Sequence, residues 1–141
     1  MKKVIIIVLA LLLVTSGAWA RGMRDVYVET GGAIGFVPEP TLVSPVTDQV
    51  DLKGKEALVF EWNPFPGDIV RRDYYDFRVY KGTNRVEDNL IYKEKIGKST
   101  YQVSLDANRF ENGQIYTWSV RQVYGGGFKS RKSYQSFKVA K

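Results

Sequence analysis

The fold is decided by the stretch at residues 115–123, which reads IYTWSVRQV. Tyr116, Trp118 and Val120 recur at every second position with polar residues after each, which is typical of a strand with one buried and one solvated face. Two large aromatic side chains on the inner face need a second layer to cover them. The stretch therefore predicts a central strand of an antiparallel sheet that packs against another sheet.

Segments on both sides of this stretch repeat the alternation. The inward residues expected in them are Leu58, Phe60, Trp62, Tyr75, Phe77, Val79, Tyr101, Val103, Leu105, Phe137 and Val139. Apolar runs at residues 42–46 and 90–92 add two strands, and Pro45 restricts the first of these to an edge or a bulge. Turn residues separate the strands, and no segment has a long helical apolar stripe. We predict an all-β fold, a seven-stranded antiparallel β-sandwich.

The first twenty residues are expected to lie outside the fold. Lys2 and Lys3 precede an unbroken run of eleven apolar residues, and Ala18 and Ala20 stand at the two positions that a signal peptidase reads. Eleven residues are too few for a bilayer-spanning helix, which needs about twenty. We therefore predict a cleaved signal peptide at residues 1–20 and a secreted or periplasmic protein.

A glycine-rich segment with a Pro38-Glu39-Pro40 end predicts a flexible N-terminal tail and linker at residues 21–40, ahead of one domain at residues 41–141. Apolar runs at residues 26–28 and 34–37 could add a strand to a neighbouring subunit. They could equally fold along their own domain or stay disordered.

Histidine and cysteine are both absent from the sequence. Their absence excludes serine–histidine catalysis, thiol chemistry, disulfides and nearly all zinc, copper or iron sites. Glu61 and Asp76 are expected at outward, solvated positions where the pKa of a carboxyl stays ordinary. Asp106 and Asn108 do not continue into the spacing of a calcium loop and are expected in turn and cap roles. We therefore expect no enzyme activity, no cofactor and no metal ion.

The order of these landmarks resembles the fibronectin type III module, an immunoglobulin-like sandwich, in the form found in bacterial secreted and surface proteins. Residues 60–64 (FEWNP) are similar to its tryptophan followed two residues later by proline, residues 75–80 (YDFRVY) to its tyrosine-rich central strand, and residues 116–120 (YTWSV) to its sixth strand. The resemblance covers residues 41–141 and implies that the Tyr116 hydroxyl bonds back to the loop before it. It implies no single function, and the loop at residues 124–130 lacks the Arg-Gly-Asp tripeptide of integrin-binding members.

Exposed aromatic and basic side chains are the remaining candidates for a site. Tyrosine and arginine are enriched where proteins bind one another, and the candidate partner-binding residues are Tyr80, Arg121, Tyr124, Phe128 and Tyr134. The other interpretation is ordinary cross-strand pairing, with arginines paired to Asp76.

Removal of Lys2 and Lys3 with the signal leaves 19 basic and 15 acidic residues, a net charge of +4. Six basic residues near the end have no acid among them: Arg121, Lys129, Arg131, Lys132, Lys138 and Lys141. They could meet an anionic surface, or form a solvated edge that discourages aggregation.

These features predict an exported, non-catalytic domain for protein binding or scaffolding in the cell envelope or extracellular space. The alternatives are a carbohydrate-binding module and a subunit of an envelope assembly that docks by strand addition. The expected partner is another envelope or extracellular protein, or a polysaccharide. Nucleic acid is not expected as a partner, and neither is an integral membrane span after signal cleavage.

Overall fold

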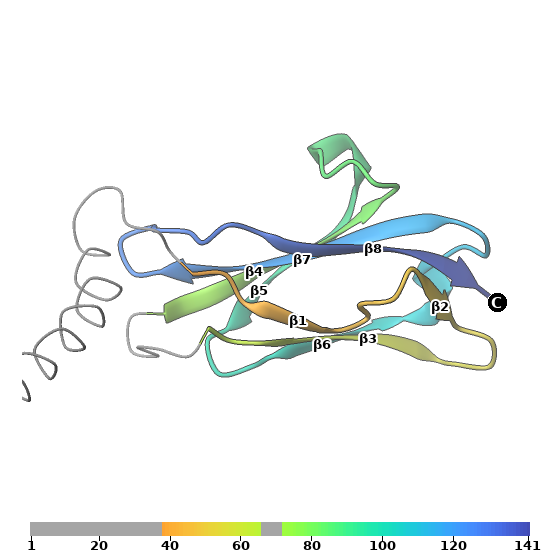
Figure 1. Ribbon diagram of the computed structural model, residues 1–141, viewed down its shortest axis with the longest axis horizontal. Helices are drawn as coiled ribbons and strands as arrows, with labels where there is room; N and C mark the ends of the chain where they lie inside the picture. Colours follow the sequence, from red (N-terminus) through yellow and green to blue (C-terminus); the bar gives the residue numbers. More distant parts are fainter. Residues whose placement is uncertain (1–37, 66–71) are drawn as a thin grey trace, which may run out of the picture. The chain divides into compact units, whose positions relative to one another are not determined.

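Two β-sheets face each other across one core in the computed structural model, which describes residues 38–65 and 72–141 (Figure 1). The three-stranded sheet has the order β1-β3-β6, with β1 at Thr41–Ser44, β3 at Ala57–Asn63 and β6 at Gln102–Asp106. The five-stranded sheet has the order β2-β8-β7-β4-β5, with β2 at Gln49–Asp51, β8 at Ser133–Ala140, β7 at Ile115–Tyr124, β4 at Arg72–Lys81 and β5 at Leu90–Gly97. The predicted all-β sandwich is confirmed. The predicted signal peptide and most of the predicted tail lie outside the described residues.

The chain from Thr41 to Asp51 is divided between the two sheets, whereas one strand was expected at residues 42–46. β1 pairs antiparallel with β3, whereas β2 pairs parallel with β8. Between them the Ser44–Pro45 peptide bond is cis, and the Pro45 carbonyl accepts a hydrogen bond of 2.9 Å from the Trp118 indole. Proline has no N–H for the ladder, and the chain leaves β1 there and crosses to the other sheet. The described residues therefore form eight strands, and one of their pairings is parallel.

Aromatic rings from both sheets meet in the core. Trp62 from β3 stacks on Phe77 from β4 with ring centroids 6.0 Å apart, and Phe77 lies 6.1 Å from Trp118 on β7. All three side chains are fully buried, while Val59 and Glu61 on the other face of β3 are exposed. The alternation expected for these strands is confirmed, and it places the aromatic residues where the two layers join.

Tyr116 fixes the start of β7 to the turn before it. Its ring packs edge-on against Phe110, with centroids 5.1 Å apart, and its hydroxyl oxygen accepts a hydrogen bond of 2.9 Å from the Glu111 N–H. The corner implied by the fibronectin type III resemblance is thus present. In the same turn, the Asp106 carboxylate accepts a hydrogen bond from the Asn108 N–H and caps a short 3-10 helix, η3 at Ala107–Arg109.

β5 is longer than the strand expected at residues 90–92. It pairs only with β4 and lies at the edge of its sheet, where Lys93, Glu94 and Lys95 are exposed and Ile96 is buried. The full length of β5 could not be predicted because its charged residues interrupt the apolar alternation that marks a strand. At the edge of a sheet, such charges discourage pairing with another chain. In the described part of the chain, no helix is long and apolar enough to cross a bilayer.

Candidate binding surface

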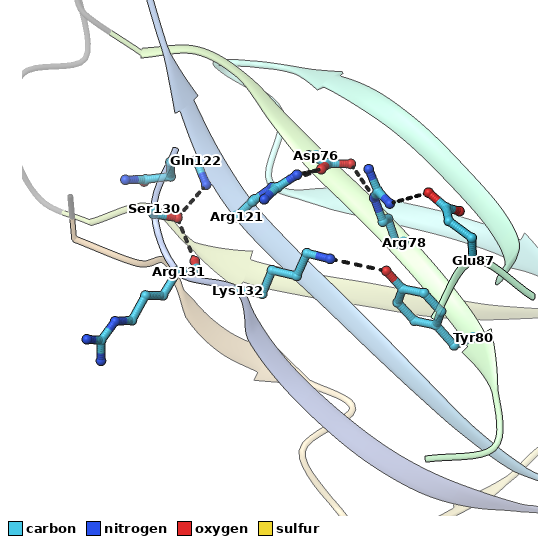
Figure 2. A network of polar contacts seen from close by, with 9 residues as sticks. All are labelled: Asp76, Arg78, Tyr80, Glu87, Arg121, Gln122, Ser130, Arg131 and Lys132. Atoms are coloured by element: carbon cyan, nitrogen blue, oxygen red, sulfur yellow. Dashed lines mark hydrogen bonds and ion pairs between the residues drawn. The ribbon is translucent and has the colours of Figure 1, made fainter. Parts of the chain in front are cut away.

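The outer face of the five-stranded sheet carries a network of charged side chains (Figure 2). Asp76 on β4 accepts a hydrogen bond of 2.9 Å from Arg78 Nε and lies 2.7 Å from Arg121 Nη2 on β7. Arg78 also forms an ion pair of 3.2 Å with Glu87, which lies in the 3-10 helix η2 at Glu87–Asn89. Two arginines and two carboxylates therefore balance each other on this part of the sheet.

The Asp76 carboxyl does not have the ordinary pKa expected for a solvated outward residue. Its side chain is only 13% exposed, and burial alone would raise its pKa. The hydrogen bonds from Arg78 and Arg121 outweigh burial and lower the pKa below the usual value. Arg121, a candidate partner-binding residue, is therefore engaged in an internal ion pair.

The connection between β4 and β5, residues 82–89, stands on the outer side of the five-stranded sheet (Figure 1). Gly82 adopts φ of +84° and donates its N–H to the Ile115 carbonyl, while its own carbonyl accepts a hydrogen bond of 2.7 Å from Thr117 Oγ1. Thr117 and Ser119, polar residues on the outward positions of β7, are almost fully buried. The Ser119 hydroxyl has no hydrogen-bond partner among the described residues.

Tyr80 is not the exposed aromatic that the sequence predicted. Its side chain lies on the outer face of β4 but is only 1% exposed. Lys132 lies over the ring, with Nζ 5.8 Å from its centroid, and donates a hydrogen bond of 3.3 Å to the tyrosine hydroxyl. The buried ring of Tyr80 cannot present a contact surface, and it positions Lys132 instead.

Tyr134 on β8 is the exposed tyrosine of this face, with 53% of its side chain accessible. The Arg85 guanidinium, from the β4–β5 connection, lies 3.5 Å from the centroid of its ring. Two open hollows flank these residues, one of 450 Å³ lined by Arg85 and one of 400 Å³ lined by Tyr134, and Lys132 lines both. We call Arg85, Lys132, Tyr134 and the two hollows the Tyr134 surface.

Arg85 and Lys132 differ from the arginines beside Asp76 because neither forms an ion pair within the described residues. Both are held against tyrosine rings, which orients them without neutralising their charge. Arg85 could not be identified from the sequence because it lies in the irregular β4–β5 connection. There, no alternation of apolar and polar residues indicates which side chains face outward. The Tyr134 surface therefore carries two positive charges that are available to a ligand.

Tyr124 is the last residue of β7, and Phe128 lies in the hairpin that leads to β8. The Tyr124 N–H donates to the Phe128 carbonyl, and Phe128 is 43% exposed while Tyr124 is partly buried. Tyr134 pairs with Ser119, five residues back along β7 from Tyr124, which corresponds to about 16 Å of strand. The structure thus does not bring these two residues into the Tyr134 surface.

Gln122 is an inward polar residue that the sequence analysis did not single out. It is fully buried at the end of β7, where its Oε1 accepts from the Phe65 N–H and its Nε2 donates to the Pro38 carbonyl and to the Tyr124 hydroxyl. Its backbone N–H donates to Ser130 Oγ (Figure 2). Pro38 is buried, so Gln122 holds the beginning of the described chain against the domain.

In residues 38–65 and 72–141, no group of three or more acidic side chains lies close enough to share a metal ion. The ion pairs described above account for Asp76 and Glu87. The outer face of the five-stranded sheet can present oriented positive charge and an aromatic edge to a partner.

No protein-family model matches the sequence, and no curated protein is similar to it. Solved structures match the fold. A computationally redesigned β-sandwich protein has a TM-score of 0.55 and 12% identity, covering 74% of this chain and 92% of that chain. The chain has an all-β fold of two packed sheets, a β-sandwich.

Two named fibronectin type III structures are also similar. The Fn3 domain of the human collagen α-1(XX) chain has a TM-score of 0.49 and 18% identity, covering 77% of this chain and 90% of that domain. A Fn3-like protein from Clostridium thermocellum has a TM-score of 0.47 and 17% identity, covering 74% of this chain and 94% of its own. Identities this low do not identify a shared ligand.

Proposed function

We propose that this chain is an exported, non-catalytic binding module and that its partner binds at the Tyr134 surface. The observation that carries the proposal is a pair of cations, Arg85 and Lys132, that form no ion pair within the described residues and line the hollows beside the exposed Tyr134. Arginine and tyrosine are the residue types that contribute most at protein interfaces. The surrounding sheet is a rigid frame, so the side chains are oriented before a partner arrives.

Export is supported by the basic start and apolar run of residues 1–20. A binding or scaffolding role is supported by the fold, since the sandwich frame holds side chains from a connection and a strand in one place. A catalytic role has no comparable support, because the chain has neither histidine nor cysteine and the acidic residues of the outer face are engaged with arginines.

Photocrosslinking in the cell that makes the protein tests the proposal. A photoreactive benzoylphenylalanine is placed at Tyr134 and, as a control, at Ser104, an exposed residue of β6 on the opposite sheet. The proposal predicts one dominant adduct from position 134 that disappears when Arg85→Gln is added, and none from position 104. The proposal is wrong if position 134 gives no adduct, or if both positions capture the same neighbours.

Fractionation of the same cells tests export. The mature chain should begin at Arg21 and should be found outside the cytoplasm, because the predicted cleavage follows Ala20. A full-length chain that remains in the cytoplasm would contradict this part of the proposal.

A further inference from the structure

We infer that the segment bound at the Tyr134 surface is an acidic peptide in which a carboxylate side chain is followed closely by an apolar one. This inference rests on the proposed function and adds the chemistry of the partner. It follows from how charge and apolar surface are divided between the two hollows that share Lys132.

The first hollow is suited to the carboxylate. Arg85, Asn84 and Lys132 line it together with Thr83 and the apolar Val86, and no acidic residue of the described chain does. Arg85 lies over the Tyr134 ring at 3.5 Å, and a guanidinium that stacks on a ring keeps its in-plane N–H donors free. Those donors form a rigid fork that matches the two oxygens of a carboxylate. Lys132 also lines this hollow and can contribute a second positive charge.

The second hollow is suited to an apolar side chain. Pro40, Leu42 and Tyr134 supply its apolar surface, and Lys132, Thr41 and Ser133 complete the lining. Glu39 also lines it and would repel a carboxylate placed there. The negative group is therefore directed to the Arg85 side and the apolar group to the Leu42 side, which gives the bound peptide a direction.

A neutral polysaccharide fits this surface less well. Sugar rings bind by stacking on the open face of an aromatic side chain, and the Arg85 guanidinium covers one face of Tyr134. Recognition here depends on charge and on the hydrogen-bonding fork rather than on stacking. An anionic polysaccharide would share the charge but has no apolar side chain for the Leu42 hollow, and it is kept as an outcome of the test.

The test is a binding titration of the mature chain with fluorescein-labelled peptides. The probe is a short peptide in which glutamate alternates with leucine and serine, and the matched peptides carry glutamine for glutamate or serine for leucine. We expect the glutamate peptide to bind, the glutamine peptide not to bind, and the serine peptide to bind several-fold more weakly. Binding should weaken further as salt is added, because exposed charges are screened.

Variants of the protein identify the site. Arg85→Gln and Lys132→Gln should each weaken binding by about tenfold or more, because each removes hydrogen bonds to a charged group. Lys98→Gln is the matched control: it removes the same charge from an exposed residue that follows the far end of β5. Arg85→Lys keeps the charge and loses the fork, so it should bind with intermediate affinity. Thermal unfolding of every variant separates a lost contact from a lost fold.

Any of the following results would overturn the inference. The glutamine peptide could bind as well as the glutamate peptide, or Lys98→Gln could weaken binding as much as Arg85→Gln. Heparin could bind with the expected sensitivity to the Arg85 and Lys132 variants while no peptide does, which would assign the surface to an anionic polysaccharide. If the photocrosslink at position 134 persists while no acidic peptide binds, the binding-module proposal stands and only this inference fails. Binding of the glutamate peptide without a photocrosslink at position 134 would contradict the proposal that a partner occupies this surface in the cell, and only the affinity of the surface for acidic peptides would stand.

Discussion

Replacement of Asp76 by asparagine should destabilise the domain although the residue lies on the outer face of a sheet. The substitution preserves the size of the side chain but removes the negative charge between Arg78 and Arg121. The carboxylate takes part in hydrogen bonds from Arg78 Nε and Arg121 Nε, both 2.9 Å long, and an ion pair of 2.7 Å with Arg121 Nη2. Hydrogen bonds to charged groups contribute about 1.5–3 kcal/mol each.

The net loss should be smaller than the sum of these contacts. Asparagine can still accept a hydrogen bond, Arg78 keeps Glu87 at 3.2 Å, and both arginines remain 20% exposed. Breaking a fully buried ion pair costs about 3–5 kcal/mol. We therefore expect Asp76→Asn to lower the free energy of unfolding by about 2–3 kcal/mol, which corresponds to a Tm lowered by roughly 8–20 °C.

Urea unfolding followed by tryptophan fluorescence measures this loss, because Trp62 and Trp118 are fully buried in the folded state. A double-mutant cycle with Arg121→Gln should give a coupling energy of at least about 1 kcal/mol. A loss below about 0.5 kcal/mol, typical of a substitution at an unengaged surface site, would refute the conclusion that this network is structural.

The effect of pH gives a second result from the same variant. Burial would raise the pKa of Asp76, but its arginine partners lower it in the folded protein. Its contribution to stability is therefore complete above the ordinary aspartate pKa of about 3.9 and is lost as pH falls through the lower folded value. The difference in stability between the natural protein and Asp76→Asn should shrink over that acidic range.

Three further predictions follow from other buried polar groups. Tyr116→Phe keeps the ring but leaves the Glu111 N–H without its partner, so unfolding experiments should show a loss of about 1–2 kcal/mol. Ser119→Ala removes a buried hydroxyl that has no partner among the described residues, so its measured stability should be unchanged or higher. Burial, partly offset by the Arg72 guanidinium, raises the pKa of Tyr75 to about 12, so an ultraviolet titration should contain a late-titrating tyrosine that is missing from Tyr75→Phe. If Tyr116→Phe is as stable as the natural protein, its hydrogen bond to Glu111 does not contribute to stability. A clear loss of stability in Ser119→Ala would mean that the hydroxyl has a partner, and a titration unchanged in Tyr75→Phe would mean that Tyr75 is not the late tyrosine.

The core of the fold could be predicted because, in a two-layer sandwich, every second residue of a strand is buried, and this two-residue repeat is visible in the sequence. Phe60, Phe77 and Trp118 each stand in an alternating segment, and each is fully buried. The parallel pairing of β2 could not be predicted in the same way. The alternation of Val50 and Leu52 would fit a strand in either sheet. Which sheet they join depends on where the chain crosses between the sheets, at Pro45.

The candidate site was less predictable because it depends on a connection rather than on a strand. The alternation placed Tyr80 and Tyr134 on the same outer face, but it could not indicate that Lys132 covers one ring and Arg85 stacks on the other. Arg121 was a candidate for partner binding, and the alternative interpretation, a pair with Asp76, is the one that the structure shows. An isolated sequence does not show which of several arginines finds an internal carboxylate.

The measurement that tests the account most directly is an NMR titration of the mature chain with the glutamate-containing peptide. The account predicts that the largest shifts occur at the Arg85 side-chain Nε–H and at the amides of Lys132 and Tyr134, with little change along β6. Shifts centred on β6 or on the β7–β8 hairpin would contradict the claim that this domain binds its partner at the Tyr134 surface. An unchanged spectrum together with a failed photocrosslink would contradict it as well.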